Sequence, residues 1–174
     1  MGWQEVDDFC ERLKSLNPAP NVLDVGCGSG RLLEQLERHF QDFQYVGTDS
    51  SRILANVAAK DHPDRIFAVA DMRSVSESPE VRASAPFDVV LAVASFHHLL
   101  TSEDRKKALK EFASVLAPRG VLMMTNWNLL SASNLAKYDK YRDADEVFHI
   151  PFSGKPRSYF AFEESVLNAE LQAA

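Results

Sequence analysis

A glycine-rich loop contains the first residues of this sequence that could do chemistry. It reads Asp24-Val25-Gly26-Cys27-Gly28-Ser29-Gly30 and lies between a short apolar run and an apolar helical stripe. Glycines at such a place let a ligand approach the backbone closely, although a plain tight turn is the alternative. The spacing is Gly-x-Gly-x-Gly, because Arg31 stands where a dinucleotide fingerprint has its third glycine. We therefore expect a ligand that carries adenosine but no pyrophosphate.

Two further carboxylates end the next two apolar segments, Asp49 in Tyr45–Asp49 and Asp71 in Ala70-Asp71-Met72. Open α/β sheets bind ligands at the carboxyl ends of their strands, so these acids are expected at the edge that also carries the glycine loop. Asp49 could accept hydrogen bonds from ribose hydroxyls or cap a helix starting at Ser51, and we favour ribose. Asp71 could accept from an adenine amino group while Met72 packs on the ring, or it could be a surface cap.

Hydrophobic periodicity predicts the elements that position these residues. Apolar residues at helical spacing predict helices over 3–15, 32–40, 51–59, 102–116 and 162–174. Short apolar runs predict strands over 21–27, 43–48, 65–70, 87–94 and 121–126, whereas 128–160 reads as irregular. Thr101 is expected to cap the helix after it. Strands and helices alternate, which predicts a doubly wound α/β fold with a mostly parallel sheet and right-handed crossovers.

Composition excludes several classes of protein. The 174 residues are 45% hydrophobic, which suits a single domain, and the net charge of -6 gives no support to strong nonspecific nucleic-acid binding. Cys10 and Cys27 have no framework spacing and are interpreted as free thiols in a reducing compartment. With no apolar run of about 18 residues and no signal-peptide layout, we expect a cytoplasmic protein with no membrane contact. We expect no metal site, because no ligand cluster has convincing metal spacing.

As an ordered set, these segments resemble the class I S-adenosylmethionine-dependent methyltransferases. The match runs from Asn21 to about Trp127 and includes Val-Leu-Asp-Val-Gly-Cys-Gly-Ser-Gly, Gly-Thr-Asp, Ala-Asp-Met, Phe-Asp-Val-Val-Leu and Leu-Ala-Pro-Arg-Gly. The resemblance implies a Rossmann-like sheet that binds S-adenosylmethionine and releases S-adenosylhomocysteine. The cofactor-binding residues that it implies are Asp24, Gly26, Cys27, Gly28, Gly30, Asp49, Ser50, Asp71, Met72 and Ala94.

The same resemblance suggests how the chain is organised. We expect one methyltransferase domain over 1–174, with an N-terminal helix at 3–15, a cofactor-binding core at 21–127, a substrate-side insertion at 128–160 and a C-terminal helix at 162–174. That family usually closes its sheet with two more strands after this last helix, so we predict a sheet that lacks them. Strand 121–126 would then be an exposed edge, paired with a second copy or a partner subunit, or covered by 128–160.

A second, closer resemblance concerns the acceptor. The segments Phe96-His97-His98-Leu99-Leu100, Arg105, Thr125-Asn126-Trp127-Asn128, Ile150-Pro151-Phe152 and Arg157-Ser158-Tyr159-Phe160 are similar to the wobble-uridine tRNA carboxymethyl methyltransferases. Those enzymes esterify a carboxylate on a tRNA base. Their Arg-Tyr-Tyr-His segment is matched here only at Arg157 and Tyr159. The resemblance implies a carboxylate acceptor, either on tRNA or on a small molecule.

The acceptor pocket is therefore expected after the fourth and fifth strands, from Ser95, Phe96, Asn126 and Trp127. His97, Arg157 and Tyr159 are the candidate catalytic residues. The Arg157 guanidinium suits a carboxylate, although a solvated surface role is the alternative.

We expect His97 to face the pocket and His98 to pack under the following helix. Two rival functions stay open: a non-catalytic S-adenosylmethionine-binding subunit that supports a partner, and a nicotinamide oxidoreductase, which the glycine spacing disfavours.

Overall fold

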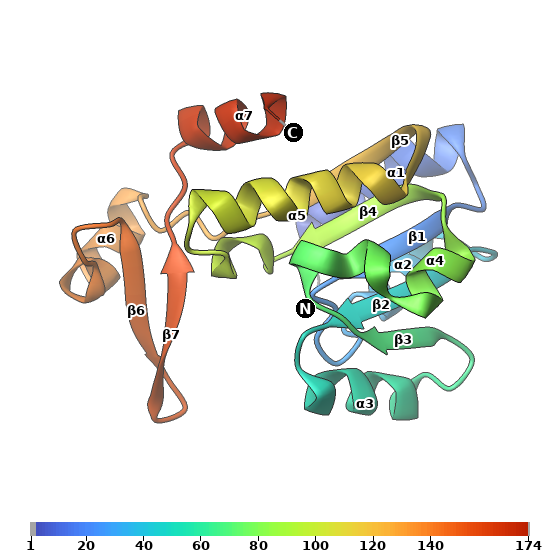
Figure 1. Cartoon of the computed structure of the whole chain (residues 1–174), viewed down its shortest axis with the longest axis horizontal. Helices are drawn as coiled ribbons and strands as arrows, with labels where there is room; N and C mark the ends of the chain where they lie inside the picture. The colour runs from blue at the N-terminus through green and yellow to red at the C-terminus, as the bar shows by residue number, and fades with distance from the viewer. Residues whose placement is uncertain (1–2, 174) are drawn as a thin grey trace.

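The central feature of the computed structural model, which describes residues 3–173, is a five-stranded parallel sheet. Its strands lie in the order β3-β2-β1-β4-β5, and every neighbouring pair is parallel (Figure 1). The strands are β1 (Asn21–Val25), β2 (Gln44–Asp49), β3 (Ile66–Val69), β4 (Phe87–Val93) and β5 (Leu116–Thr125). The predicted mostly parallel Rossmann-like α/β fold is therefore confirmed.

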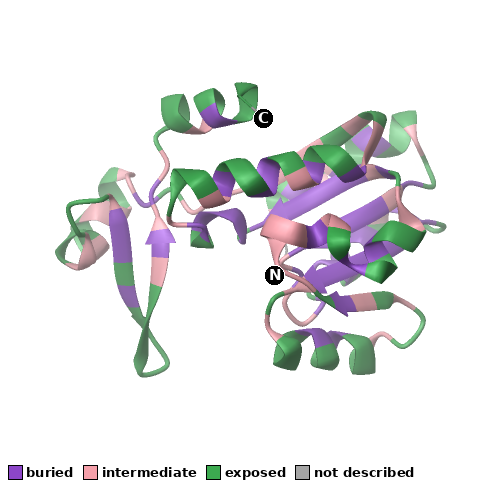
Figure 2. Ribbon diagram, in the orientation of Figure 1, coloured by how far each residue is buried: buried purple, intermediate pink, exposed green. Residues whose placement is uncertain are grey.

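Helices cover both faces of this sheet, as a doubly wound fold requires. They are α1 (Gln4–Leu16), α2 (Leu33–His39), α3 (Arg52–Asp61), α4 (Pro79–Ser84) and α5 (Ser102–Val115), with short 3-10 turns η1 (Met72–Glu77) and η2 (Phe96–His98). Alternate strand residues serve opposite faces: Val90 packs with Phe112 of α5, whereas Leu91 packs with Leu36 of α2. Figure 2 shows the inner strands β1, β2 and β4 as buried along most of their length, whereas the edge strands β3 and β5 are more exposed. Thr101 Oγ1 accepts the Asp104 N–H at 3.1 Å, so the predicted cap of α5 is also confirmed.

The segment expected to be irregular forms a small structural unit. It contains α6 (Ala132–Tyr138), the 3-10 turn η3 (Asp139–Tyr141) and an antiparallel hairpin of β6 (Val147–Phe152) and β7 (Lys155–Phe160). The hairpin turn is Ser153-Gly154, and both residues have positive φ, as a two-residue hairpin turn of the primed type requires. Proline is disfavoured inside strands, and Pro151 pairs with Pro156, which explains why the sequence pattern concealed these strands.

Strand β5 is an edge of the sheet. Within residues 3–173 it pairs with β4 alone, while β6 and β7 form a separate two-stranded sheet. The predicted edge is thus present, although the strand begins five residues earlier than the expected 121. Residues 128–160 do not cover it by strand pairing, and pairing with a second copy stays a prediction.

The C-terminal helix α7 (Glu164–Gln172) follows the hairpin and packs on α5. In Figure 1 the hairpin stands beyond the end at which β4 finishes, and β7 contacts the η2 turn there. None of the described helices is long and apolar enough to span a bilayer.

One prediction follows from the turn after β1. Gly26 has φ +78°, and a Cβ there would lie 2.4 Å from Ser95 Cβ, whereas a Cβ on Gly28, at φ +58°, meets nothing within 4 Å. Gly26→Ala should lower the free energy of unfolding by about 1–3 kcal/mol more than Gly28→Ala, because only the first adds a clash to the backbone strain. Urea denaturation of both variants measures this, and equal losses would show that the contact with Ser95 relaxes freely.

Candidate functional site

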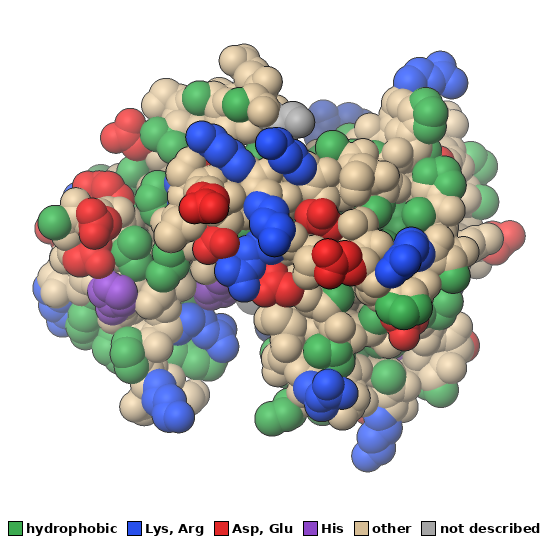
Figure 3. Space-filling view, viewed as in Figure 1, with side chains coloured by type: hydrophobic (Ala, Val, Ile, Leu, Met, Phe, Trp, Pro, Cys, Tyr) green, Lys and Arg blue, Asp and Glu red, His purple; other side chains and the backbone are tan. Residues whose placement is uncertain are grey.

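A cavity of about 650 Å³ opens at the carboxyl edge of the sheet. It is bordered by the glycine loop, the ends of β2 and β3, the turn after β4, and one residue of β7. Figure 3 shows a hollow between the hairpin and the side of the molecule that carries α3. The sequence-predicted residues that line the cavity are Gly26, Gly28, Asp49, Ser50, Asp71, Met72, Ala94, Ser95 and Arg157. The sequence thus locates this edge of the sheet, although not every predicted residue reaches it.

The three loop glycines serve three different purposes. Gly26 makes room for Ser95, whose Oγ donates to the Val25 carbonyl at 2.7 Å. Gly30 makes room for His62, whose ring would lie 3.0 Å from an added Cβ. Only Gly28 has open space where a side chain would be, and its backbone borders the cavity. Gly26 and Gly28 border the cavity and Gly30 does not, and contact of the loop glycines with a ligand stays a prediction.

Asp49 ties the glycine loop to the end of β2. Its Oδ2 accepts the Gly28 N–H at 2.9 Å, and its Oδ1 accepts the Ser51 N–H at 2.8 Å. The cap of α3 is Ser51, whose Oγ accepts the Leu54 N–H, and not Asp49. An ionised carboxylate offers about four lone-pair sites, so Asp49 keeps acceptor capacity toward the cavity that it lines.

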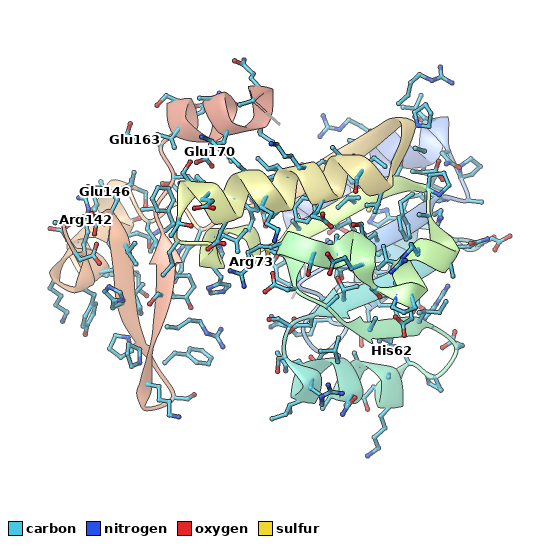
Figure 4. All side chains as sticks on the ribbon, in the orientation of Figure 1. His62, Arg73, Arg142, Glu146, Glu163 and Glu170 are labelled. Carbon is cyan, nitrogen blue, oxygen red and sulfur yellow. The ribbon has the colours of Figure 1, made fainter. Side chains whose placement is uncertain are left out.

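Asp71 is not a free carboxylate. Arg73, labelled in Figure 4, donates to both of its oxygens and also donates to Asp104 at 3.0 Å. This guanidinium lowers the pKa of Asp71 and keeps the carboxyl ionised. Sequence reasoning missed Arg73 and the place of Asp104 in the cavity, because their contact joins residues 31 positions apart.

Asp24 lies beneath the cavity and does not line it. Burial raises its pKa to about 7, although the Tyr45 hydroxyl donates to its Oδ2 at 2.8 Å. Cys27 is also buried, with its Sγ packed toward Gly47, and burial raises its pKa. Both residues were predicted to belong to the cofactor site, Asp24 directly or through the loop, and the structure places both side chains behind the loop.

His98, and not His97 as predicted, is the histidine that lines the cavity. His97 is buried, its Nδ1 accepts the Trp127 N–H at 3.2 Å, and burial lowers its pKa to about 3. His98 is exposed and lines the cavity. Its Nδ1 lies 3.0 Å from the Ser158 carbonyl oxygen, which can only accept, so Nδ1 carries the proton and Nε2 keeps its lone pair. Consecutive residues of the η2 turn point in different directions, and the sequence cannot say which one faces inward.

The remaining acceptor-side residues form the wall behind His98 rather than the pocket itself. Phe96, expected in the pocket, is fully buried and stacks on Phe162 at 5.8 Å between ring centroids. Tyr159 is buried against both histidines and Trp127.

Asn126 does not line the cavity either, and its Oδ1 is buried without a hydrogen-bond partner among the described residues. Trp127 packs between the rings of Tyr159 and Tyr138, which makes it part of the small core under the hairpin.

Two cationic side chains border the cavity without a carboxylate partner in residues 3–173. Arg157 of β7 is exposed and stacks on Phe152, with its guanidinium carbon 4.2 Å from the ring centroid. Arg31, which follows the glycine loop, lines the same cavity and lies near Trp3. Sequence reasoning noted Arg31 only as the residue that breaks the dinucleotide spacing.

Known proteins share this fold and this loop. A family model described as a methyltransferase domain matches residues 23–122. A dTDP-3-amino-3,4,6-trideoxy-alpha-D-glucopyranose N,N-dimethyltransferase from Streptomyces venezuelae is 31% identical over 71% of this chain and 49% of its own length. A tRNA (carboxymethyluridine(34)-5-O)-methyltransferase from Arabidopsis thaliana is 31% identical over 72% of this chain and 28% of its own.

This chain therefore spans half or less of the length of these relatives. Among solved structures, a SAM-dependent methyltransferase from Methanosarcina mazei superimposes with a TM-score of 0.75 and 19% identity, covering 94% of this chain and 82% of that one. That likeness shows the fold, and the match over 23–122 shows the family: this chain belongs to the methyltransferase domain family.

Proposed function

We propose that this cavity binds S-adenosylmethionine and that the chain transfers its methyl group to a carboxylate oxygen of an acceptor, releasing S-adenosylhomocysteine. The observation that carries the acceptor assignment is Arg157, a cation without a described carboxylate partner that lines the same cavity as Asp49 and Asp71. The similarity to methyltransferases that act on an amino sugar and on a tRNA carboxymethyluridine supports methyl transfer and leaves the acceptor open.

The residues on the glycine-loop side fit the cofactor. Gly28 leaves open space against its backbone, and Asp49 keeps lone pairs for two ribose hydroxyls. Met72 would pack on the adenine, whose amino group would share Asp71 with Arg73. Arg31 would pair with the carboxylate of the methionine end. When bound, S-adenosylmethionine supplies an electrophilic methyl group on its sulfonium.

The residues on the hairpin side would hold and orient the acceptor. Arg157 presents a fork of donors that matches a carboxylate, and its stacking on Phe152 limits the directions that the fork can take. A carboxylate is already ionised at neutral pH and needs no proton removed before it reacts. Catalysis would then rest on positioning and on exclusion of water, to which the aromatic wall of Tyr159 and Trp127 contributes.

A second candidate acceptor, a hydroxyl group, is favoured by the geometry of His98. Its Nδ1 proton is bound by the Ser158 carbonyl, so Nε2 could take a proton from an acceptor in the cavity. Although His98 is exposed at the cavity, partial desolvation of its ring by the surrounding protein, with a smaller contribution from Arg157, lowers its pKa and keeps the ring neutral near pH 7. With a hydroxyl acceptor, His98 would therefore be the general base, in place of His97, the candidate catalytic histidine of the sequence.

Cofactor binding is tested by Asp49→Asn. The variant should bind S-adenosylhomocysteine about 10- to 100-fold more weakly, because the amide replaces a charged acceptor worth ~1.5–3 kcal/mol. Isothermal titration calorimetry measures the affinity. Asp88→Asn is the matched control, since Asp88 also accepts a backbone N–H, from Asn21 at the amino end of β1, far from the cavity. Equal affinities of wild type and Asp49→Asn would refute the assignment.

Acceptor binding is tested by Arg157→Ala. Mass spectrometry with labelled S-adenosylmethionine identifies the acceptor among organic acids and tRNA. With that acceptor, the variant should lose about 10²-fold in methyl transfer while its affinity for S-adenosylhomocysteine stays at the wild-type value. Lys155→Ala removes a charge from the same strand without touching the cavity and should keep full turnover. Full turnover by Arg157→Ala would rule out the proposed acceptor site.

The pH dependence separates the two acceptor classes. A carboxylate acceptor stays ionised above its own pKa near 4, so turnover should be flat from about pH 5.5 to 8. A hydroxyl acceptor needs neutral His98, whose pKa lies below its usual value of about 6.5, so turnover would fall as the pH drops through that lowered pKa. A profile that falls in this way, and is flattened by His98→Gln, would replace the carboxylate assignment.

A further inference from the structure

A buried arginine outside the cavity holds two parts of its wall in place. Arg105 of α5 has only 4% of its side chain exposed, and its guanidinium uses both edges and one face. One edge meets the carboxylate of Glu170, with Nε donating at 2.8 Å and Nη2 donating at 2.8 Å. The other edge, at Nη1, donates to the carbonyl oxygens of Leu99 at 3.1 Å and Leu100 at 3.0 Å.

The carbonyl bonds connect Arg105 to the cavity. Leu99 and Leu100 line it, and they follow His98 directly in the turn after β4. Backbone carbonyls in such a connecting segment have no strand partner, so an arginine that donates to two of them fixes the path of the chain. Arg105 itself does not line the cavity, and it acts on the site only through this segment.

The face of the guanidinium connects Arg105 to the hairpin. Its central carbon lies 3.8 Å from the ring centroid of Phe160, the last residue of β7, and 5.4 Å from that of Phe162. The segments 96–100 and 157–162 also meet through the bond between His98 and the Ser158 carbonyl. Arg105 thus contacts both the turn that lines the cavity and the strand that carries Arg157.

Glu170 connects Arg105 to the C-terminal helix α7. Its side chain, labelled in Figure 4, is 7% exposed and also accepts a hydrogen bond from Ser102 Oγ at 3.0 Å. A charge as deeply buried as that of Arg105 is tolerated only with a partner, and Glu170 is the carboxylate that pairs with it. No residue of α7 lines the cavity, and Arg105 joins α7 to the part of the cavity wall formed by Leu99 and Leu100.

We propose that Arg105 is a positioning residue that couples the cofactor cavity to the hairpin and to α7. A ligand in the cavity restricts the motion of Leu99 and Leu100. Arg105, which donates to both of their carbonyls, then restricts the motion of Glu170, with which it pairs, and of Phe160, on which it stacks. Lysine cannot replace it, because one ammonium cannot reach the carboxylate and both carbonyls while stacking on a ring. The proposal rests on S-adenosylhomocysteine binding in the cavity and is independent of the acceptor.

The test compares hydrogen exchange with and without saturating S-adenosylhomocysteine. In the wild type, the ligand should slow exchange of the amides of 164–172 roughly fivefold, although α7 does not touch the cavity. Arg105→Lys should lose this response and bind the ligand about tenfold more weakly. A merely structural arginine would instead speed exchange in α7 by the same factor with and without ligand.

Arg65→Lys is the matched control. Arg65 also stacks on a phenylalanine, donates to a backbone carbonyl and pairs with a glutamate, but it does so at Phe43 and Glu37, away from the cavity. It should leave the ligand affinity and the α7 response unchanged. The proposal is overturned if Arg105→Lys keeps the wild-type response, or if Arg65→Lys loses it equally.

Phe160→Leu tests the contact between Arg105 and the hairpin, and it also serves if Arg105→Lys does not fold. In the wild type, the ligand should also slow exchange in residues 147–152, whose Val147 pairs with Phe160. The variant keeps the ion pair and both carbonyl bonds, so α7 should still respond to the ligand while residues 147–152 should not. An unchanged ligand response of residues 147–152 would contradict coupling through the contact between Arg105 and Phe160.

If the wild type does not bind S-adenosylhomocysteine, the proposed function fails. The positioning role of Arg105 is then tested without ligand. It is supported if Arg105→Lys, unlike Arg65→Lys, speeds hydrogen exchange in both 96–101 and 155–162, and it is contradicted if Arg105→Lys does not.

Discussion

The site depends on one carboxylate that holds the glycine loop across the edge of the sheet. Asp49 ends β2 and accepts from Gly28 and Ser51, so the loop after β1 and the start of α3 are fixed to the same point. This is possible because β1 and β2 run parallel in register, with Val25 beside Thr48. The N–H groups of Gly26 and Cys27, which both donate to the Thr48 carbonyl, complete the junction. Without these hydrogen bonds, the glycine loop would not be held at a fixed distance from the other walls of the cavity.

The carboxylates that line the cavity lie on one of its two sides, together with Arg31 and Arg73. On the first side, Asp49 at the end of β2 binds backbone N–H groups, and Asp71 after β3 shares Arg73 with Asp104 of α5. The hairpin contributes Arg157, which stacks on a ring and has no described carboxylate partner. A ligand with hydroxyls and an amino group suits the first side, and an anionic acceptor suits the second. The chemistry proposed here follows from this asymmetry rather than from a protein nucleophile.

The sequence predicts what depends on short-range pattern. Short apolar runs locate the five parallel strands, and period-3.6 patterns locate their helices. The parallel arrangement then brings Asp49 and Asp71 to one edge. The Thr101 cap follows from local residue types alone.

What the sequence does not predict depends on packing between distant segments. The choice between His97 and His98 is made by Trp127 and Ser158, 30 and 60 residues away. Phe96 is drawn into the core by Phe162. The hairpin was hidden by prolines that face each other, and Glu170 offers no local signal that it pairs with Arg105.

A crystal structure of the chain with S-adenosylhomocysteine tests the assignment of the two sides of the cavity most directly. We predict that the ribose hydroxyls lie within hydrogen-bond distance of Asp49 and that the sulfur faces His98 and Arg157 across the cavity. A ligand bound elsewhere, or one whose sulfur faces away from the hairpin, would contradict the assignment of the two sides.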